Sequence, residues 1–222
     1  MPDAATAPET VILADGEYPA EGIPAALLAQ ARYVVCCDGA ADAYTARGGT
    51  TAQRFRDILH IVPDQETNDL TKAFSFCMEQ GRRELTILGA TGGREDHAIG
   101  NIALLADYAR QADVQMVTPY GVFNAVEGAA TFDSMPRQQV SIFTIVPGTR
   151  ISVRGLRYTP PAEGFRSWWC GTLNEAETDT FAIETDGPAL LFRTFLRKAC
   201  RPSRRPGGMT RPSARSPQTG MS

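Results

Sequence analysis

The sequence predicts an α/β chain in which a Rossmann-like domain with a parallel sheet precedes a small all-β sandwich domain. Over the first 118 residues short apolar runs alternate with helical patterns, as in βαβ units. After Thr118 the helical patterns stop, and glycine and proline separate short β-type segments. The 222 residues, 43% hydrophobic and 21% charged, suffice for two modest globular domains.

In the first part, strands are predicted at residues 11–14, 33–37, 58–62, 85–88 and 114–118. Helices are predicted between them, at residues 24–31, 40–47, 69–80 and 96–110. The third helix has the clearest signal, because five apolar residues recur with helical spacing: Leu70, Ala73, Phe74, Cys77 and Met78. Gly81 follows as a stop signal. We therefore predict an α/β domain over residues 1–118.

In the second part, the segments 140–146, 150–153, 180–185 and 189–194 have the composition and length of strands. Gly121, Gly128 and the Gly187-Pro188 pair are among the turn residues that separate such segments. We predict a sandwich domain over residues 119–196. Residues 197–222, rich in Arg, Pro, Ser and Gly, are predicted to form a basic disordered tail.

The net charge of −3 combines two unlike parts. From Arg193 onward there are eight basic residues and no acid, so residues 1–192 carry 14 basic against 25 acidic residues, a formal charge of −11. Such an acidic body disfavours binding to nucleic acid or an anionic membrane. A phosphate-bearing ligand would need metal ions or local positive dipoles there.

The chain is expected to be soluble and cytoplasmic. No apolar run reaches the roughly 20 residues that span a bilayer, and the first ten residues, with two acids and no Lys or Arg, do not resemble a secretory signal. Five cysteines without a CxxC pair make a zinc cluster or a disulfide framework improbable. Four of the five are interpreted as small buried hydrophobes.

Polar residues follow the first four predicted strands in turn. These are Asp15-Gly16, Asp38-Gly39, Pro63-Asp64-Gln65 and the glycine-rich segment 89–94. The carboxyl ends of strands in an open parallel sheet are where ligands bind, beside the free amides of helix N-termini. This repeated placement predicts a functional site at that edge.

Residues 63–69 place three carboxylates, Asp64, Glu66 and Asp69, between a strand and a helix. Helix capping by Thr67, Asn68 or Asp69 explains part of this stretch. Capping needs one side chain, however, and crowded carboxylates repel each other unless a divalent cation neutralises them. Magnesium, which prefers one or two carboxylates together with phosphate oxygens, fits this arrangement.

The loop from Gly89 to His97 has the second informative composition. Its glycines let backbone amides approach an anion, and Arg94 offers a fork that matches phosphate geometry. Asp96, at the following helix start, is a candidate for capping, metal binding or accepting a proton. His97 is interpreted as a packed or capping histidine.

Taken together, these motifs resemble those of the thiamine pyrophosphokinase family. The matching pieces, in the family's order over residues 10–194, are Ala14-Asp15-Gly16, residues 37–41, residues 63–73, residues 89–97 with Asn101, and Gly171-Thr172-Leu173-Asn174. The resemblance implies transfer of pyrophosphate from ATP to the thiamine hydroxyl, giving thiamine diphosphate and AMP. It also implies an α/β nucleotide domain, a β-sandwich, and a homodimer that binds thiamine between subunits.

The resemblance assigns candidate residues to each part of the site. Asp69, Arg94 and Asp96 are the catalytic candidates, and Asp69 and Asp96 are the candidate Mg²⁺ ligands. The candidates for ATP binding are Asp15, Asp38, Gln65, Thr91, Gly92, Arg94 and Asn101. Thiamine is expected to contact Trp169, Thr172 and Asn174. Trp168 or Trp169 is expected to stack on its rings, with burial in the sandwich core as the alternative for each.

One family segment, Gly-Asp-x-Asp-Ser, has no counterpart between the Asp38 motif and Pro63. Its acids help to bind magnesium in the family, and the sequence leaves open whether Asp15, Asp42 or Asp57 replaces them. Two alternatives therefore stand beside an active enzyme. One is a catalytically inactive relative that binds nucleotide or thiamine as a sensor or binding module, and the other is an unproductive, partly stable chain.

Overall fold

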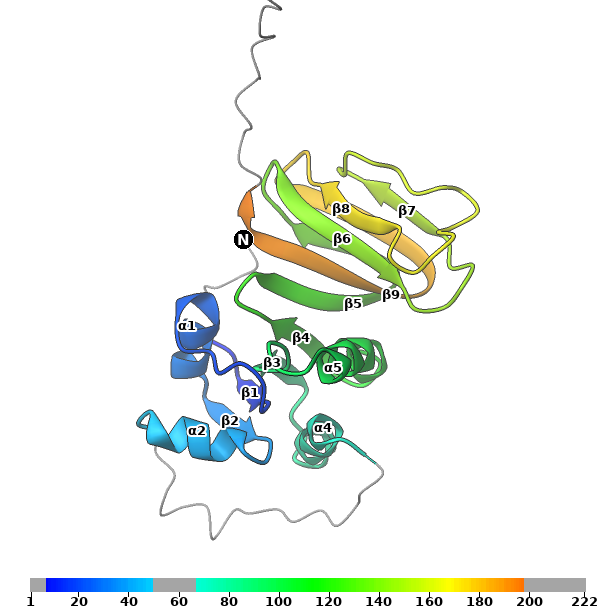
Figure 1. The fold of residues 1–222 in the computed structure, drawn as a ribbon. Coiled ribbons are helices and arrows are strands. Elements are labelled where there is room, and N and C mark those ends of the chain that lie inside the picture. The colour runs from blue at the N-terminus through cyan, green and yellow to red at the C-terminus, as the bar shows by residue number, and fades with distance from the viewer. Residues whose placement is uncertain (1–6, 50–66, 198–222) are drawn as a thin grey trace, which may run out of the picture.

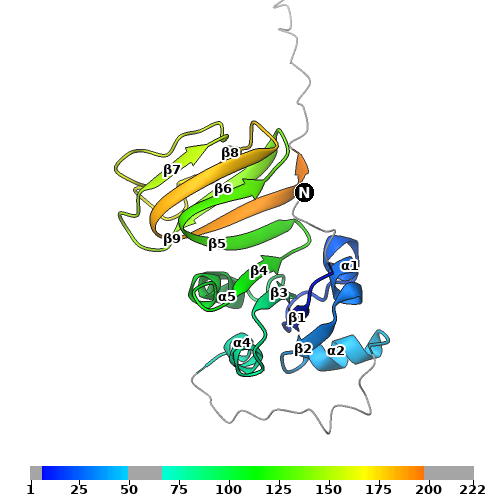
Figure 2. The same cartoon turned by 180° about the vertical axis from the view of Figure 1, so that it is seen from behind.

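The computed structural model describes residues 7–49 and 67–197 (Figure 1). Its α/β part carries a sheet with helices on both faces, and its β part lies beyond one edge of that sheet (Figures 1 and 2). Among the described residues no helix is long and apolar enough to cross a membrane. The predicted fold class is confirmed. The division of the chain at residue 118 stays a prediction.

Within residues 7–49 and 67–118, four parallel strands form the α/β sheet in the order β2-β1-β3-β4: β1 (Thr10–Leu13), β2 (Tyr33–Cys36), β3 (Glu84–Leu88) and β4 (Asp113–Val117). The helices are α1 (Gly22–Gln30), α2 (Ala40–Ala46), α4 (Asp69–Glu79) and α5 (Glu95–Tyr108). These positions confirm the predicted elements to within two residues. The strand predicted at 58–62 lies outside the described residues.

Two apolar clusters hold the helices on opposite faces of this sheet. On one face, Ile12, Ile87 and Met116 of the strands pack in one cluster with α4 and α5. On the other, Val11 and Leu13 share a cluster with residues of α1 and α2. Alternate residues of each strand therefore face different helices, which explains why β1 and β3 are apolar almost throughout.

The β part contains five strands: β5 (Gly121–Asp133), β6 (Gln138–Thr144), β7 (Ile151–Arg154), β8 (Gly171–Glu175) and β9 (Thr180–Arg197). β9 pairs with β5 over most of its length, with β7 over its first half and with β6 over its second half. Buried side chains of these strands form a separate apolar cluster that includes Val140, Ile142, Phe181, Ile183 and Leu191.

The two parts share one hydrogen-bonded sheet. β4 and β5 are antiparallel neighbours, and the order continues β4-β5-β9-β6-β8 (Figure 1). They are joined by a tight turn in which Thr118 Oγ1 accepts hydrogen bonds from the amides of Tyr120 and Gly121, both at 3.2 Å. The predicted boundary at 118/119 thus lies in a hairpin rather than in a linker.

The turns predicted at Gly128 and Gly187-Pro188 are wrong, whereas the turn predicted at Gly121 is present where β4 leads into β5. Gly121 begins β5 and Gly128 lies within it, while the two segments predicted at 180–185 and 189–194 are one strand, β9. Opposite Val126 and Gly128, β9 pairs through Ala189 and Thr185, so residues 186–188 form a bulge. Long-range pairing along β9 outweighs the local turn propensity of these residues. β9 also includes Arg197, the first residue of the predicted tail, and residues 198–222 lie outside the described residues.

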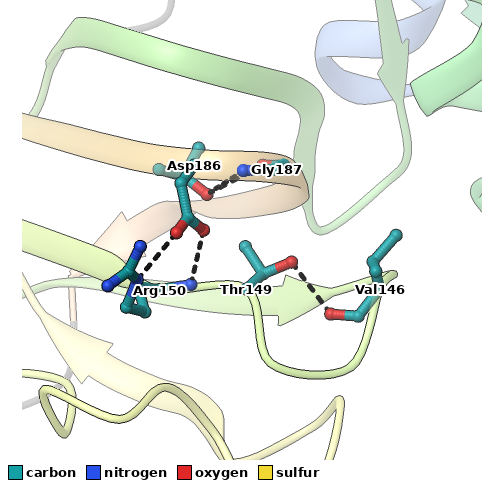
Figure 3. A network of polar contacts seen from close by, with 6 residues as sticks. Val146, Thr149, Arg150, Asp186 and Gly187 are labelled. Atoms are coloured by element: carbon teal, nitrogen blue, oxygen red, sulfur yellow. Dashed lines mark hydrogen bonds and ion pairs between the residues drawn. The ribbon is translucent and has the colours of Figure 1, made fainter.

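Polar contacts fix this bulge against the start of β7 (Figure 3). The Asp186 carboxylate accepts hydrogen bonds from the backbone amide of Arg150 at 2.7 Å and from its Nε at 2.8 Å. Beside it, Thr149 Oγ1 donates to the carbonyl oxygen of Val146 at 2.8 Å. The Arg150–Asp186 pair therefore has a structural setting, at the bend of a long strand.

A buried cation lies inside the β part. Arg193, on β9, is 6% exposed. It donates hydrogen bonds to the Asp133 carbonyl oxygen at 2.8 Å and to Asn124 Oδ1 at 3.1 Å. Its guanidinium carbon lies 4.9 Å from the Phe132 ring centre, and burial lowers its pKa to about 10. Arg193 thus ties the two ends of β5 to β9.

Candidate active site

The loops after β1 and β3 are joined by backbone hydrogen bonds at one edge of the sheet. The amide of Gly16 donates to the Gly89 carbonyl oxygen at 2.7 Å, and the amide of Glu17 donates to the Thr91 carbonyl oxygen at 2.8 Å. Because β1 and β3 are adjacent and parallel, their carboxyl ends coincide. The predicted meeting of the Asp15-Gly16 and glycine-rich segments is therefore confirmed.

Close backbone packing explains the glycines of this junction. A Cβ atom on Gly16 would lie 2.4 Å from the Gly89 carbonyl oxygen and 2.6 Å from that of Thr91. Gly92 has a φ of 79°, and a Cβ atom there would lie 2.5 Å from Oε2 of Glu17. The exposed Glu17 carboxylate thus lies over the glycine-rich loop, a neighbour that the sequence did not indicate.

Asp15 and Asp38 lie on neighbouring loops, after β1 and β2. Asp15 Oδ2 is 2.6 Å from the position that a Cβ on Gly39 would take, so its carboxylate lies directly against the second loop. Asp38 has a φ of 26°, a conformation that non-glycine residues rarely adopt and that often occurs at functional sites. Both aspartates are exposed at this edge of the sheet.

The start of α4 is connected to the glycine-rich loop through two asparagines. Asn68 caps α4, accepting a hydrogen bond from the Thr71 amide at 2.8 Å, and its amide group donates to Asn101 Oδ1 at 3.5 Å. Asn101, on α5, donates to the Ala90 carbonyl oxygen at 3.0 Å. The capping interpretation is confirmed for Asn68. The exposed Asp69, which follows it, pairs with Lys72 at 3.2 Å.

Arg94 and Asp96 form a bidentate ion pair at the start of α5. Arg94 Nε donates to Asp96 Oδ1 at 3.1 Å, and Nη2 donates to Oδ2 at 2.5 Å. The hydrogen bond from Arg94 is the main cause that lowers the pKa of Asp96. His97 is exposed, so its interpretation as a packed histidine is wrong. Gln65 lies outside the described residues.

Asp69 and Asp96 suit magnesium by the chemistry of their donor atoms. Both offer exposed carboxylate oxygens, each at the start of a helix beside this edge of the sheet. Within residues 7–49 and 67–197 no group of three or more His, Cys, Asp or Glu side chains could hold a metal ion. Two carboxylates with phosphate oxygens nevertheless match the usual protein contribution to a magnesium site.

A pocket of about 350 Å³ lies in the β part, between β8 and the loop that precedes it. Thr172 and Asn174, two of the predicted thiamine contacts, line this pocket. Asn174 is buried, and its side chain accepts from the Tyr158 amide at 3.0 Å and donates to the Tyr158 carbonyl oxygen at 2.7 Å. It therefore holds the pocket wall in place.

Three large apolar side chains at or just before β8 are exposed, and one of them, Leu173, lines the pocket. Trp168 and Trp169 are 59% and 56% exposed, so the alternative that places them in the sandwich core is wrong. Leu173 lines the pocket, is 66% exposed and has a φ of 61° at the bulge of β8. No pattern in the sequence indicates the positive φ of Leu173, because this conformation depends on the pairing of β8 with β6.

The pocket lies far along the sheet from the loops after β1 and β3. β3 and β8 are five strand positions apart in the sheet, about 24 Å along its surface at the usual strand spacing. The structure therefore brings together Asp15, Asp38, Asp69, Thr91, Gly92 and Asn101 around one edge, with the Arg94–Asp96 pair beside them. Trp169, Thr172 and Asn174 form a second group.

Three cysteines of the α/β part have thiols whose pKa values are raised by burial. Cys37 and Cys77 are buried, which confirms their interpretation as small buried hydrophobes. Cys36 is only half-buried, and Cys170 is exposed, so this interpretation is wrong for Cys170. Burial raises the pKa of the Cys37 thiol from about 9 to about 12. It raises those of Cys36 and Cys77 to about 11.

We expect the free energy of unfolding to fall as pH rises above about 9. In that range the unfolded chain loses thiol protons that the folded chain retains, so the unfolded state binds fewer protons and gains stability. Urea denaturation at pH 8, 9 and 10 measures this slope. The Cys37→Ala variant should show a shallower slope than the unchanged chain, and an equal slope would contradict the assignment to Cys37.

Two family models match the chain. Residues 49–118 match the thiamin pyrophosphokinase catalytic domain, and residues 121–192 match its substrate-binding domain. Together these segments span more than half of the chain. No curated protein sequence matches it.

Solved structures share the fold. A protein from Lactobacillus plantarum is 21% identical with a TM-score of 0.69, covering 83% of this chain and 98% of its own. Thiamine pyrophosphokinase from Bacillus subtilis is 16% identical with a TM-score of 0.65, covering 84% and 99%. The yeast enzyme is 15% identical with a TM-score of 0.62, covering 85% and 87%.

Proposed function

Because this chain belongs to the thiamin pyrophosphokinase family, we propose that its glycine-rich loop and Arg94 bind the phosphates of ATP during pyrophosphate transfer to the thiamine hydroxyl. The products are thiamine diphosphate and AMP. One observation carries this assignment. The loops after β1 and β3 are locked together by backbone hydrogen bonds, at a sheet edge where a helix also begins.

The phosphate-binding proposal rests on local positive charge in an acidic body. α5 begins at Glu95, directly after the loop, so its first amides and its dipole favour an anion there. Arg94 is 74% exposed and adds a guanidinium at the same place. As thiamine attacks the β-phosphorus, negative charge spreads over the phosphate oxygens, and these donors stabilise it.

Asp69 and Asp96 would hold magnesium. When bound, the cation supplies charge neutralisation between phosphate groups. Asp69 or Asp96 also orients the thiamine hydroxyl or accepts its proton. Their exposed carboxylates on neighbouring helix starts support both roles.

Thiamine binding is assigned to the pocket beside β8, through Trp169, Thr172 and Asn174. The exposed tryptophans offer aromatic faces for a planar ring system, and Asn174 fixes the pocket wall. Since the pocket and the phosphate loops lie five strand positions apart, a homodimer would bring the pocket of one copy to the loops of the other. A cytoplasmic location stays a prediction.

The expected result is AMP release that requires ATP, magnesium and thiamine together. AMP and thiamine diphosphate are quantified after incubation of the full chain, with omission of each component in turn as the control. A well-folded chain, shown by a cooperative melt, that releases no AMP above background would contradict the proposed function.

A further inference from the structure

Asp96 occupies the guanidinium face that a phosphate would use. Arg94 presents Nε and Nη2 side by side, and both donate to one carboxylate, at 3.1 and 2.5 Å. Bidentate pairing of this kind is also how arginine recognises phosphate. An incoming phosphate that takes these two donors must therefore displace the carboxylate.

The carboxylate is also fixed in place by its own helix. Asp96 Oδ1 accepts a hydrogen bond from the His97 backbone amide at 2.9 Å, in the first turn of α5. The two partners are two residues apart and both face solvent. Arg94 is thus held by a nearby anion at the end of the glycine-rich loop, where ATP would arrive.

We propose that Asp96 makes the site select magnesium-bound ATP over metal-free ATP, because Asp96 releases Arg94 only when its carboxylate engages a cation. The inference rests on the proposed function. Metal-free ATP must break the ion pair without compensation, and its phosphates then lie beside an uncompensated carboxylate. With a cation at Asp96, the same displacement leaves both the carboxylate and the guanidinium paired.

A second exposed arginine–aspartate pair in the chain has a purely structural setting. Arg150 and Asp186 also pair, but Asp186 additionally accepts the Arg150 backbone amide and lies at the β9 bulge (Figure 3). Replacing Asp186 by asparagine removes a similar exposed ion pair far from the glycine-rich loop. This variant is the control for loss of an ion pair as such.

A closer control distinguishes loss of the Arg94–Asp96 ion pair from loss of one negative charge at the start of α5. Glu95 lies beside Asp96 in the first turn of α5, is exposed, and among the described residues forms no hydrogen bond or ion pair with Arg94. Glu95→Gln therefore removes the same charge from the same helix start and leaves the fork in place.

The test measures the Kd of ATP by calorimetry, at low ionic strength, with a chelator and no metal. We expect Asp96→Asn to bind metal-free ATP about fivefold more tightly than Glu95→Gln does, since only Asp96→Asn removes the carboxylate that competes with phosphate for Arg94. Asp186→Asn should bind like the unchanged chain. In an Arg94→Gln background, Asp96→Asn and Glu95→Gln should have equal effects.

The outcomes are distinguishable. The selectivity role is overturned if Asp96→Asn and Glu95→Gln bind metal-free ATP equally well. It is also overturned if Asp96→Asn still binds metal-free ATP more tightly than Glu95→Gln in the Arg94→Gln background. In either case the proposed function stands, provided that the unchanged chain binds ATP with magnesium. Absence of ATP binding by the folded unchanged chain under both conditions would overturn the selectivity role and the proposed function together.

Discussion

Replacing Arg94 by glutamine is expected to lower kcat/KM for pyrophosphate transfer by about 10²- to 10³-fold, the usual cost of removing one donor that stabilises transition-state charge. Arg94 is 74% exposed at the start of α5, so its loss should leave the melting temperature nearly unchanged. AMP release at varied ATP concentration gives kcat and KM separately. Arg94→Lys should recover only part of the rate, because lysine lacks the fork.

The control for this variant is Arg150→Gln, which removes an arginine of similar exposure, 71%, from an ion pair with Asp186 in the β part. It should keep the rate of the unchanged chain. If Arg94→Gln also keeps that rate, Arg94 does not contact the phosphates, and the placement of ATP at this loop is wrong.

Replacing Gly16 by alanine is expected to reduce both stability and activity. The added methyl group would lie 2.4 and 2.6 Å from two carbonyl oxygens of the glycine-rich loop, closer than folded chains tolerate. Because these are backbone atoms, the loops after β1 and β3 must separate, at a cost of about 1–3 kcal/mol. Urea denaturation measures the loss, and AMP release should fall at least about tenfold, as expected when positioning is lost.

Gly100→Ala is the matched control. Gly100 lies within α5, and a Cβ there would have no atom within 4 Å. Alanine favours a helix interior over glycine, so this variant should be more stable by about 1 kcal/mol. A Gly16→Ala chain as stable and active as the unchanged one would show that the two loops need not stay packed.

The α/β elements were predictable because their signals are local. The apolar positions of α4, from Leu70 to Cys77, follow the helical period and are buried together. In contrast, β5 contains two glycines, and β8 is a short strand with a bulge. Each exists through pairing with a distant strand, which no local pattern in the sequence reveals.

For the site, the sequence predicted which loops meet but not how their side chains pair. Parallel strand ends bring the Asp15 loop to Gly89, so topology alone was sufficient. The Arg94–Asp96 pair and the contact of Asp15 with Gly39 depend on the exact path of turns between strand and helix. The exposed Trp168 and Trp169 lie in the irregular stretch between β7 and β8, which no periodic pattern in the sequence describes.

The hairpin from β4 to β5 makes the two parts mechanically continuous. Thr118 closes that turn with its side chain and backbone, and β5 then continues as the neighbour of β4. A load applied to β8 would pass through β6, β9 and β5 to the phosphate loops as strain in a single sheet. The described junction is therefore a continuous hairpin, which favours the proposed homodimer, rather than bending within one copy, as the way to bring the distant pocket to these loops.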